Sequence, residues 1–153
     1  INDVDKVIKE IMQNRLGIEI SKNVSKCKRG QYLVLTVTMK NLEGGMGHIN
    51  INKYWVNTSL LYMKNVETNE TIELTSGLIW KREPWRQGDI IVLPGAGLSL
   101  YGFYGDSVNI LLSEKYKPGK YEMYCVYSND NKGDYDNWWT GTIYSNKITI
   151  EIE

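Results

Sequence analysis

The chain contains one histidine, His48, and any serine- or cysteine-type hydrolase chemistry would have to use it as the general base. His48 ends the glycine-rich segment 43–48, and no Gly-x-Ser-x-Gly motif accompanies it. A glycine-rich segment positions a base poorly, whereas proton transfer needs placement to a fraction of an ångström. One histidine and two distant cysteines also give no zinc ligand set. The sequence therefore predicts a protein that is not an enzyme and has no catalytic residue.

Oxygen ligands gather in residues 129–136, where Asp130, Asp134 and Asp136 could chelate a hard cation such as calcium. The spacing does not match an EF-hand, because Lys132 stands where an oxygen ligand is required. The other interpretation is a solvated hairpin loop, in which Asn, Asp and Gly serve the turn. We expect the solvated loop and no cofactor, and calcium binding by the three aspartates stays open as the alternative.

Large aromatic side chains lie in and beside the same loop, at Tyr135, Trp138 and Trp139, and Trp85 lies in mid-chain. Flat rings beside carboxylates and amides suit protein hot spots and sugar stacking alike. Adjacent residues of a strand point to opposite faces, so we expect one of Trp138 and Trp139 inside the core and the other free. These four aromatic residues form the predicted ligand-binding set.

The chain that must position these residues is 153 residues long, and this length predicts one domain. Lysine plus arginine and aspartate plus glutamate both number 18, so the net charge is zero. A neutral chain argues against nucleic acid as a partner, since nucleic-acid binding favours a basic face. No apolar run approaches the roughly 18 residues that a transmembrane segment requires. The 11 tyrosines and 5 tryptophans against one phenylalanine suit half-exposed sheet faces and binding loops.

Alternating hydrophobicity predicts strands along most of the chain, most clearly over residues 31–41, where Leu33, Leu35, Val37 and Met39 share one face. Further strands are expected at residues 17–21, 59–63, 71–74, 90–93, 98–104, 121–127 and 142–152. We expect residues 79–87 to form an irregular crossing segment around Pro84, and residues 108–112 to form a single turn. The count of seven to nine strands with regular turns predicts an all-β antiparallel sandwich.

Residues 1–16 differ from the rest, with Val4, Val7, Ile8, Ile11 and Met12 at helical spacing. They predict a short N-terminal helix or linker, followed by the sandwich domain over residues 17–153. The chain starts at Ile1 rather than Met, and we expect that a signal peptide or a lipoprotein leader was removed ahead of it.

The motif Tyr116-x-Pro-Gly-x-Tyr121 resembles the tyrosine corner of immunoglobulin-like and fibronectin-like domains. The segment 139–146, followed by isoleucines at every second residue from Ile148 to Ile152, looks like the terminal hairpin of secreted bacterial immunoglobulin-like domains. The resemblance covers the last quarter of the chain and the strand at 31–41. It implies that the Tyr121 hydroxyl bonds nearby backbone, that the loop carries a Trp-x-Gly turn, and that a Ser-Asn pair kinks the last strand. Cys125 lies four residues after Tyr121, not two as in antibody domains, so only the architecture is carried over.

The sequence does not decide whether its two cysteines, Cys27 and Cys125, form a disulfide. Cys125 lies in mid-strand, as a bridge between facing strands requires, whereas Cys27 lies in a basic turn. A bridge would need an unusual register, and the alternative is a pair of free thiols.

Together these patterns predict a non-catalytic, extracytoplasmic interaction module, secreted or anchored at the cell surface, that binds a protein partner through its loop aromatics. One alternative is a carbohydrate-binding module. Another is a proteinase inhibitor that presents sandwich loops, with residues 80–85 as the inhibitory segment.

Overall fold

The computed structural model describes residues 3–4, 16–41, 49–51, 59–74, 78–81, 90–92, 103–131, 133 and 138–153. The predicted N-terminal helix lies outside these residues except at Asp3, Val4 and Leu16, and Leu16 already belongs to a strand. No helix in the described ranges is long and apolar enough to cross a membrane.

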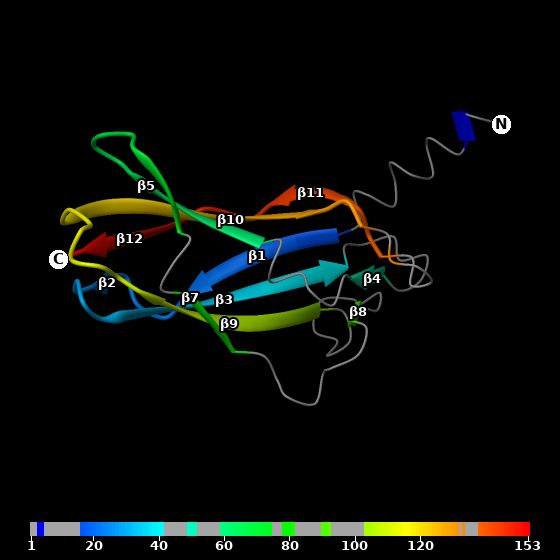
Figure 1. Ribbon diagram of the computed structural model, residues 1–153, viewed down its shortest axis with the longest axis horizontal. Helices are drawn as coiled ribbons and strands as arrows, with labels where there is room; N and C mark the ends of the chain where they lie inside the picture. The colour runs from blue at the N-terminus through cyan, green and yellow to red at the C-terminus, as the bar shows by residue number, and fades with distance from the viewer. Residues whose placement is uncertain are drawn as a thin grey trace.

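The protein is mainly β, with two principal sheets that lie one above the other (Figure 1). One sheet has the order β1-β3-β9-β7, and the other, six-stranded, has the order β2-β12-β10-β5-β6 with β11 also paired to β10. A small third sheet pairs β4 with β8. The strands are β1 Leu16–Lys22, β2 Lys26–Cys27, β3 Tyr32–Asn41, β4 Ile49–Ile51, β5 Ser59–Asn65, β6 Thr71–Leu74, β7 Leu78–Lys81, β8 Ile90–Val92, β9 Phe103–Leu111, β10 Gly119–Asn129, β11 Gly141–Tyr144 and β12 Ile148–Ile152.

The pairing within the six-stranded sheet is mixed, which corrects the prediction of a purely antiparallel sandwich. β2 runs parallel to β12, through Lys26 opposite Glu151 and Cys27 opposite Ile152. The described residues also contain more strands than the seven to nine predicted. The additional strands include β2, β4 and β8, which are only two or three residues long. Such short pairings carry too few alternating residues to be recognised in a sequence.

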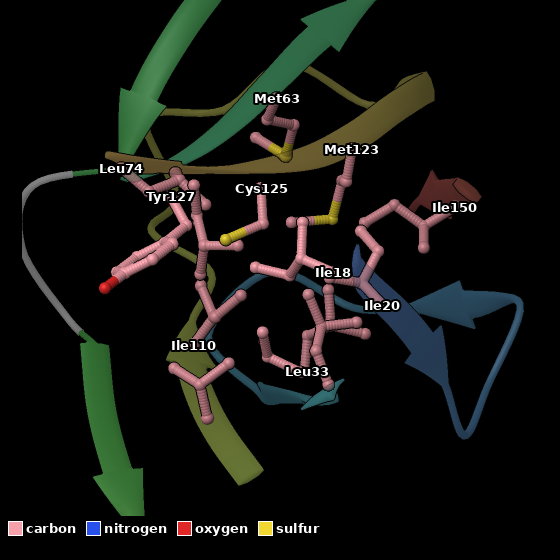
Figure 2. Packing of buried hydrophobic residues seen from close by; sticks show 14 of the residues in the cluster. Ile18, Ile20, Leu33, Met63, Leu74, Ile110, Met123, Cys125, Tyr127 and Ile150 are labelled. Atoms are coloured by element: carbon pink, nitrogen blue, oxygen red, sulfur yellow. The ribbon is translucent and has the colours of Figure 1, made fainter. Parts of the chain in front are cut away.

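The core lies between the two principal sheets and takes every second residue of their long strands. The expected face of β3 is fully buried at Leu33, Leu35, Val37 and Met39, which confirms the prediction. Figure 2 shows Met63, Met123 and Cys125 of the six-stranded sheet packed toward Ile18, Ile20, Leu33 and Ile110 of the other. Burial of these apolar side chains, at roughly 25 cal/mol per Å², is the main source of stability.

Two mid-chain predictions are wrong. Of residues 108–112, expected as a turn, residues 108–111 continue β9, where Val108 and Ile110 are buried and Leu111 is exposed. Residues 79–81, expected in an irregular segment, belong to β7. β9 is held on both sides, by β3 and by β7, and these long-range pairings decide its conformation.

The corner before β10 has the geometry expected from the sequence resemblance. The Tyr121 side chain is buried, and its hydroxyl donates a hydrogen bond to the carbonyl oxygen of Lys117 at 2.6 Å. Four residues after Tyr121, at Cys125, strand β10 contacts the Ser145-Asn146 pair. The Cys125 N–H donates to Ser145 Oγ at 2.8 Å, and the Ser145 N–H donates to the Cys125 carbonyl oxygen at 2.8 Å. Ser145 therefore ends the pairing of β11 with β10 and turns the chain toward β12.

Cys27 and Cys125 are both buried and both free. Cys27 is opposite Ile152, which is opposite Gly119, so Cys125 lies six residues farther along β10 and two strands away. Six residues of strand span about 20 Å, far beyond the roughly 7 Å that a disulfide allows between Cα atoms. The bridge that the sequence left open is therefore excluded by the sheet register.

We expect both thiols to be protected in the folded protein and both to react after unfolding. Burial raises the pKa of Cys125 from 9.0 to about 12, a difference of about 3 units that leaves about a thousandfold less thiolate at pH 8. Burial also raises the pKa of Cys27. An aromatic disulfide reagent at pH 8 should react very slowly with native protein. In denaturant without reductant it should titrate two thiols per chain, and a count near zero would reveal a bridge.

The raised pKa of Cys125 also determines whether stability rises or falls with pH. Between pH 9 and about 12 the folded protein keeps the Cys125 proton that the unfolded chain loses, so the free energy of unfolding falls as the pH rises through this range. A Cys125→Ala variant, although less stable overall, should show a shallower alkaline decline in urea melts.

Candidate functional site

The predicted loop aromatics are buried where the structure describes them. Trp138 and Trp139 are each 8% exposed, so neither is the free ring that the sequence led us to expect. Trp139 stacks on Tyr127 of β10, with ring centroids 5.8 Å apart and planes at 27°. Residues 138–140 precede β11 and are not a strand, so the alternation of strand side chains does not apply to them. Tyr135 and Trp85 lie outside the described residues.

The base of this loop is fixed by Asn129, which is itself buried. Its side-chain amide donates to the Trp139 carbonyl oxygen at 2.6 Å and to the Asn131 carbonyl oxygen at 2.8 Å. The indole N–H groups of both tryptophans and the Tyr127 hydroxyl have no hydrogen-bond partner among the described residues. Ring packing and the Asn129 amide, rather than hydrogen bonds from these rings, hold this end of the core.

The candidate calcium ligands are only partly described. Asp130 is exposed at the end of β10, and Asp134 and Asp136 lie outside the described residues, as does His48. In the ranges that the structure describes, no three histidine, cysteine or acidic side chains come together as a metal site. Calcium binding by this loop therefore stays a prediction.

A different group of aromatic side chains gathers on the outer face of the six-stranded sheet. Along β5 and β10 the residues between the buried ones point outward, and the register places Tyr62 opposite Tyr124, Leu60 opposite Val126, and Val126 opposite Tyr144. We call this surface the tyrosine face, and it comprises Leu60, Tyr62, Tyr124, Val126 and Tyr144. Tyr144 is 69% exposed and Leu60 38%, and the other three are half-buried.

The tyrosine rings are held in a defined arrangement. The ring centroids of Tyr62 and Tyr124 are 5.2 Å apart, and their planes differ by 18°. Rings lying edge to edge in one plane could not approach so closely, so these two overlap face to face across β5 and β10. Each ring therefore has one face covered by the other ring, and the second face of Tyr62 is directed toward β6, where Glu73 is directly opposite.

The electrostatics of this face are set by nearby carboxylates. Glu73 of β6 is directly opposite Tyr62, and Glu122 of β10 is directly opposite Lys64. Desolvation raises the pKa of Tyr62, and the Glu73 carboxylate raises it further together with Tyr124 and Tyr144. The Glu73 carboxylate therefore acts on the same hydroxyl that desolvation already keeps protonated.

Sequence reasoning missed this surface because its residues come from three segments that are far apart in sequence. Its members come from residues 60–62, 124–126 and 144, and only the strand register brings them together. A sequence signal was nevertheless present. In both strands tyrosine occupies positions that alternate with the buried residues, and the high tyrosine content already suited half-exposed sheet faces.

A polar depression lies at the opposite end of the sheets, near the C-terminus and β2. Its volume is about 440 Å³, and it is lined by Lys28, Arg29, Glu114 and Glu153. Arg29 Nη1 donates to the Glu114 carbonyl oxygen at 3.4 Å. Two cations and two carboxylates line the depression, and its described lining contains no histidine and no serine or cysteine nucleophile.

No protein-family model matches the chain, and no curated protein matches it. Among solved structures it is similar to Pseudomonas fluorescens alkylpurine DNA glycosylase AlkC bound to DNA containing an abasic site analogue, at 9% identity and a TM-score of 0.43 over 91% of this chain and 30% of that chain. It is also similar to a family 123 glycoside hydrolase from Clostridium perfringens, at 13% identity and a TM-score of 0.44 over 91% of this chain and 27% of that chain. A mutant β-glucosidase from Listeria innocua in complex with laminaribiose has 10% identity and a TM-score of 0.43 over 90% of this chain and 16% of that chain.

This chain spans less than a third of each of these enzymes, and at such low TM-scores the likenesses carry no argument about activity. The molecule is a small β-rich domain of two principal sheets, with distant structural likeness to parts of larger enzymes.

Proposed function

We propose that this chain is a non-catalytic binding module with an immunoglobulin-like fold, acting outside the cytoplasm, and that it holds a protein partner on the tyrosine face. The fold assignment is supported by strand order. If β1, β3, β5, β7, β9, β10 and β12 are numbered one to seven, one sheet contains strands one, two, five and four, and the other contains strands three, six and seven. Immunoglobulin domains divide their strands in this way. The Tyr121 corner at the start of β10 supports the same assignment.

The observation that carries the binding proposal is the exposed cluster of three tyrosines and two aliphatic residues on one sheet face. A row of large apolar side chains across three neighbouring strands is unusual on a free surface and is typical of a contact site. Tyrosine provides contact area at low conformational-entropy cost, together with a hydroxyl for hydrogen bonds.

A protein partner is favoured over a glycan by the ring arrangement. A sugar-stacking platform directs its ring faces away from the sheet, whereas Tyr62 and Tyr124 are stacked on each other, so their ring faces are directed along the sheet. The outward edges and hydroxyls are suited to the side chains and backbone of a protein surface.

The proposal is tested by selecting a random dodecapeptide display library on the intact chain and measuring the affinity of the enriched peptides. We expect Tyr144→Ser, which removes a ring that is 69% exposed, to weaken binding about tenfold or more. The matched control is Tyr32→Ser, which removes a ring that is 52% exposed on the other sheet and should change the affinity little.

Two outcomes would overturn this function. Peptides whose affinity is the same for Tyr144→Ser and the parent chain would place binding elsewhere. A glycan array that gives saturable binding lost in Tyr144→Ser would make the face a sugar site.

A further inference from the structure

The charges around the tyrosine face are unevenly balanced. Glu122 is directly opposite Lys64, so these two opposite charges lie side by side on neighbouring strands. Glu73 is directly opposite Tyr62 and is exposed. The ion pairs of the described residues join Lys26 to Glu151 and Lys40 to Glu19, and neither involves Glu73. Lys64 is also opposite Thr71 and so is diagonal to Glu73, and neither ion pair involves Lys64. Two carboxylates, Glu73 and Glu122, thus share one lysine, and the face carries surplus negative charge at β6.

The ring of Tyr62 adds a second attraction for a cation at the same place. One face of this ring is stacked on Tyr124, and since β5 lies between β10 and β6, its other face is directed toward β6. The face of an aromatic ring carries negative charge density, which attracts lysine and arginine. A cation that approaches from β6 thus meets the ring of Tyr62 on one side and the carboxylate of Glu73 on the other.

We infer that the protein partner presents an arginine or lysine side chain to the tyrosine face, with its cation between the ring face of Tyr62 on the β6 side and the carboxylate of Glu73. The inference rests on the proposed function, because it names the chemistry of the partner at the same surface. Arginine is favoured over lysine, since a planar guanidinium can stack on a ring and pair with a carboxylate at once. The remaining apolar contact comes from Leu60, Val126 and Tyr144.

Two display libraries separate this inference from the function on which it rests. One library excludes arginine and lysine, and the other excludes aspartate and glutamate. We expect peptides whose binding requires Tyr144 to be enriched from the second library only. Equal enrichment from both would overturn the cation and leave the binding function standing. Failure of both to yield peptides that depend on Tyr144 would overturn the binding function itself.

Point variants then test the position of the cation. For an enriched peptide, Glu73→Gln should weaken binding roughly three- to tenfold and reduce its dependence on salt concentration. Glu151→Gln is the matched control, because it makes the same charge change on the same sheet but at β12. Tyr62→Leu keeps an apolar side chain but removes the negative charge density of the ring face, so it should also weaken binding.

Replacing each arginine of the peptide by citrulline, which keeps the shape and removes the charge, should identify one position that accounts for most of the Glu73 effect. If Glu73→Gln and Glu151→Gln weaken binding equally, the cation is not at Tyr62 and the inference is wrong.

Discussion

Replacing Gly141 by alanine is expected to lower the free energy of unfolding by about 3 kcal/mol. Gly141 begins β11 with φ at +139°, where a side chain strains the backbone. A Cβ atom built at this position would lie 2.9 Å from Cη2 of Trp139, closer than such atoms approach in proteins. Trp139 cannot withdraw easily, because its ring is stacked on Tyr127 in the core. The two costs, backbone strain and overpacking, therefore add.

Two other glycines separate these costs. Gly119 has a similar φ of +147°, but a Cβ atom there would meet its nearest neighbour, Asn65 Nδ2, at an ordinary 3.8 Å. Gly30 has φ at +83° and nothing within 4 Å of the added atom. Gly119→Ala and Gly30→Ala should each cost about 1 to 2 kcal/mol in urea melts, since they carry the backbone strain alone.

The overpacking term is isolated by a double-mutant cycle with Trp139→Leu. Trp139→Leu alone should destabilise the protein, because it removes a buried ring from the core. In that background Gly141→Ala should cost about as much as Gly119→Ala does, since the ring atom that the Cβ would meet is gone. If Gly141→Ala costs no more than Gly119→Ala in the parent chain, the contact with Trp139 is not what requires glycine there.

The parts of the fold that follow from sequence are those determined within one strand. Alternation in β3 identifies its buried face correctly, because four consecutive inward positions are large and apolar. The Tyr121 corner follows from its motif, because the hydroxyl bonds a carbonyl only four residues away. Both signals are local, so no partner strand is needed to read them.

The parts that do not follow are those set by distant partners. β9 carries the same alternation as β3 at Val108 and Ile110, but a short window cannot distinguish it from a turn without its two neighbouring strands. The tyrosine face requires a register between strands about sixty residues apart. The burial of Trp138 and Trp139 depends on how the chain turns before Gly141, which the alternation rule does not describe.

Replacing Asn146 by alanine is the second expected large effect, a loss of about 2 kcal/mol in the free energy of unfolding. Asn146 lies between β11 and β12 of the six-stranded sheet, and its side chain reaches β1 of the other sheet. Asn146 Oδ1 accepts a hydrogen bond from the Ile20 N–H at 2.8 Å, and Asn146 Nδ2 donates to the Ile20 carbonyl oxygen at 3.0 Å. One amide thus takes the place of a neighbouring strand at this point of the β1 edge and joins the two layers.

The paired donor and acceptor give a test that simple loss of packing would not pass. Asn146→Asp keeps the acceptor for the Ile20 N–H, but at neutral pH it sets a carboxylate oxygen against the Ile20 carbonyl oxygen. We expect it to destabilise the protein at least as much as alanine at pH 7. Below the pKa of the new carboxyl group, the acid proton can be donated to Ile20, so Asn146→Asp should recover stability relative to Asn146→Ala.

Asn23→Asp is the control for the general effect of an added carboxylate, because Asn23 is exposed and has no hydrogen bond among the described residues. Urea melts of the three variants and the parent chain at pH 7 and at pH 4 measure the difference. If Asn146→Asp and Asn146→Ala differ by the same amount at both pH values, the amide does not pair with Ile20 as the structure has it. If instead only Asn146→Asp gains stability in acid, the two sheets are joined by a side chain that imitates a strand, and β1 is closed there to pairing with another chain.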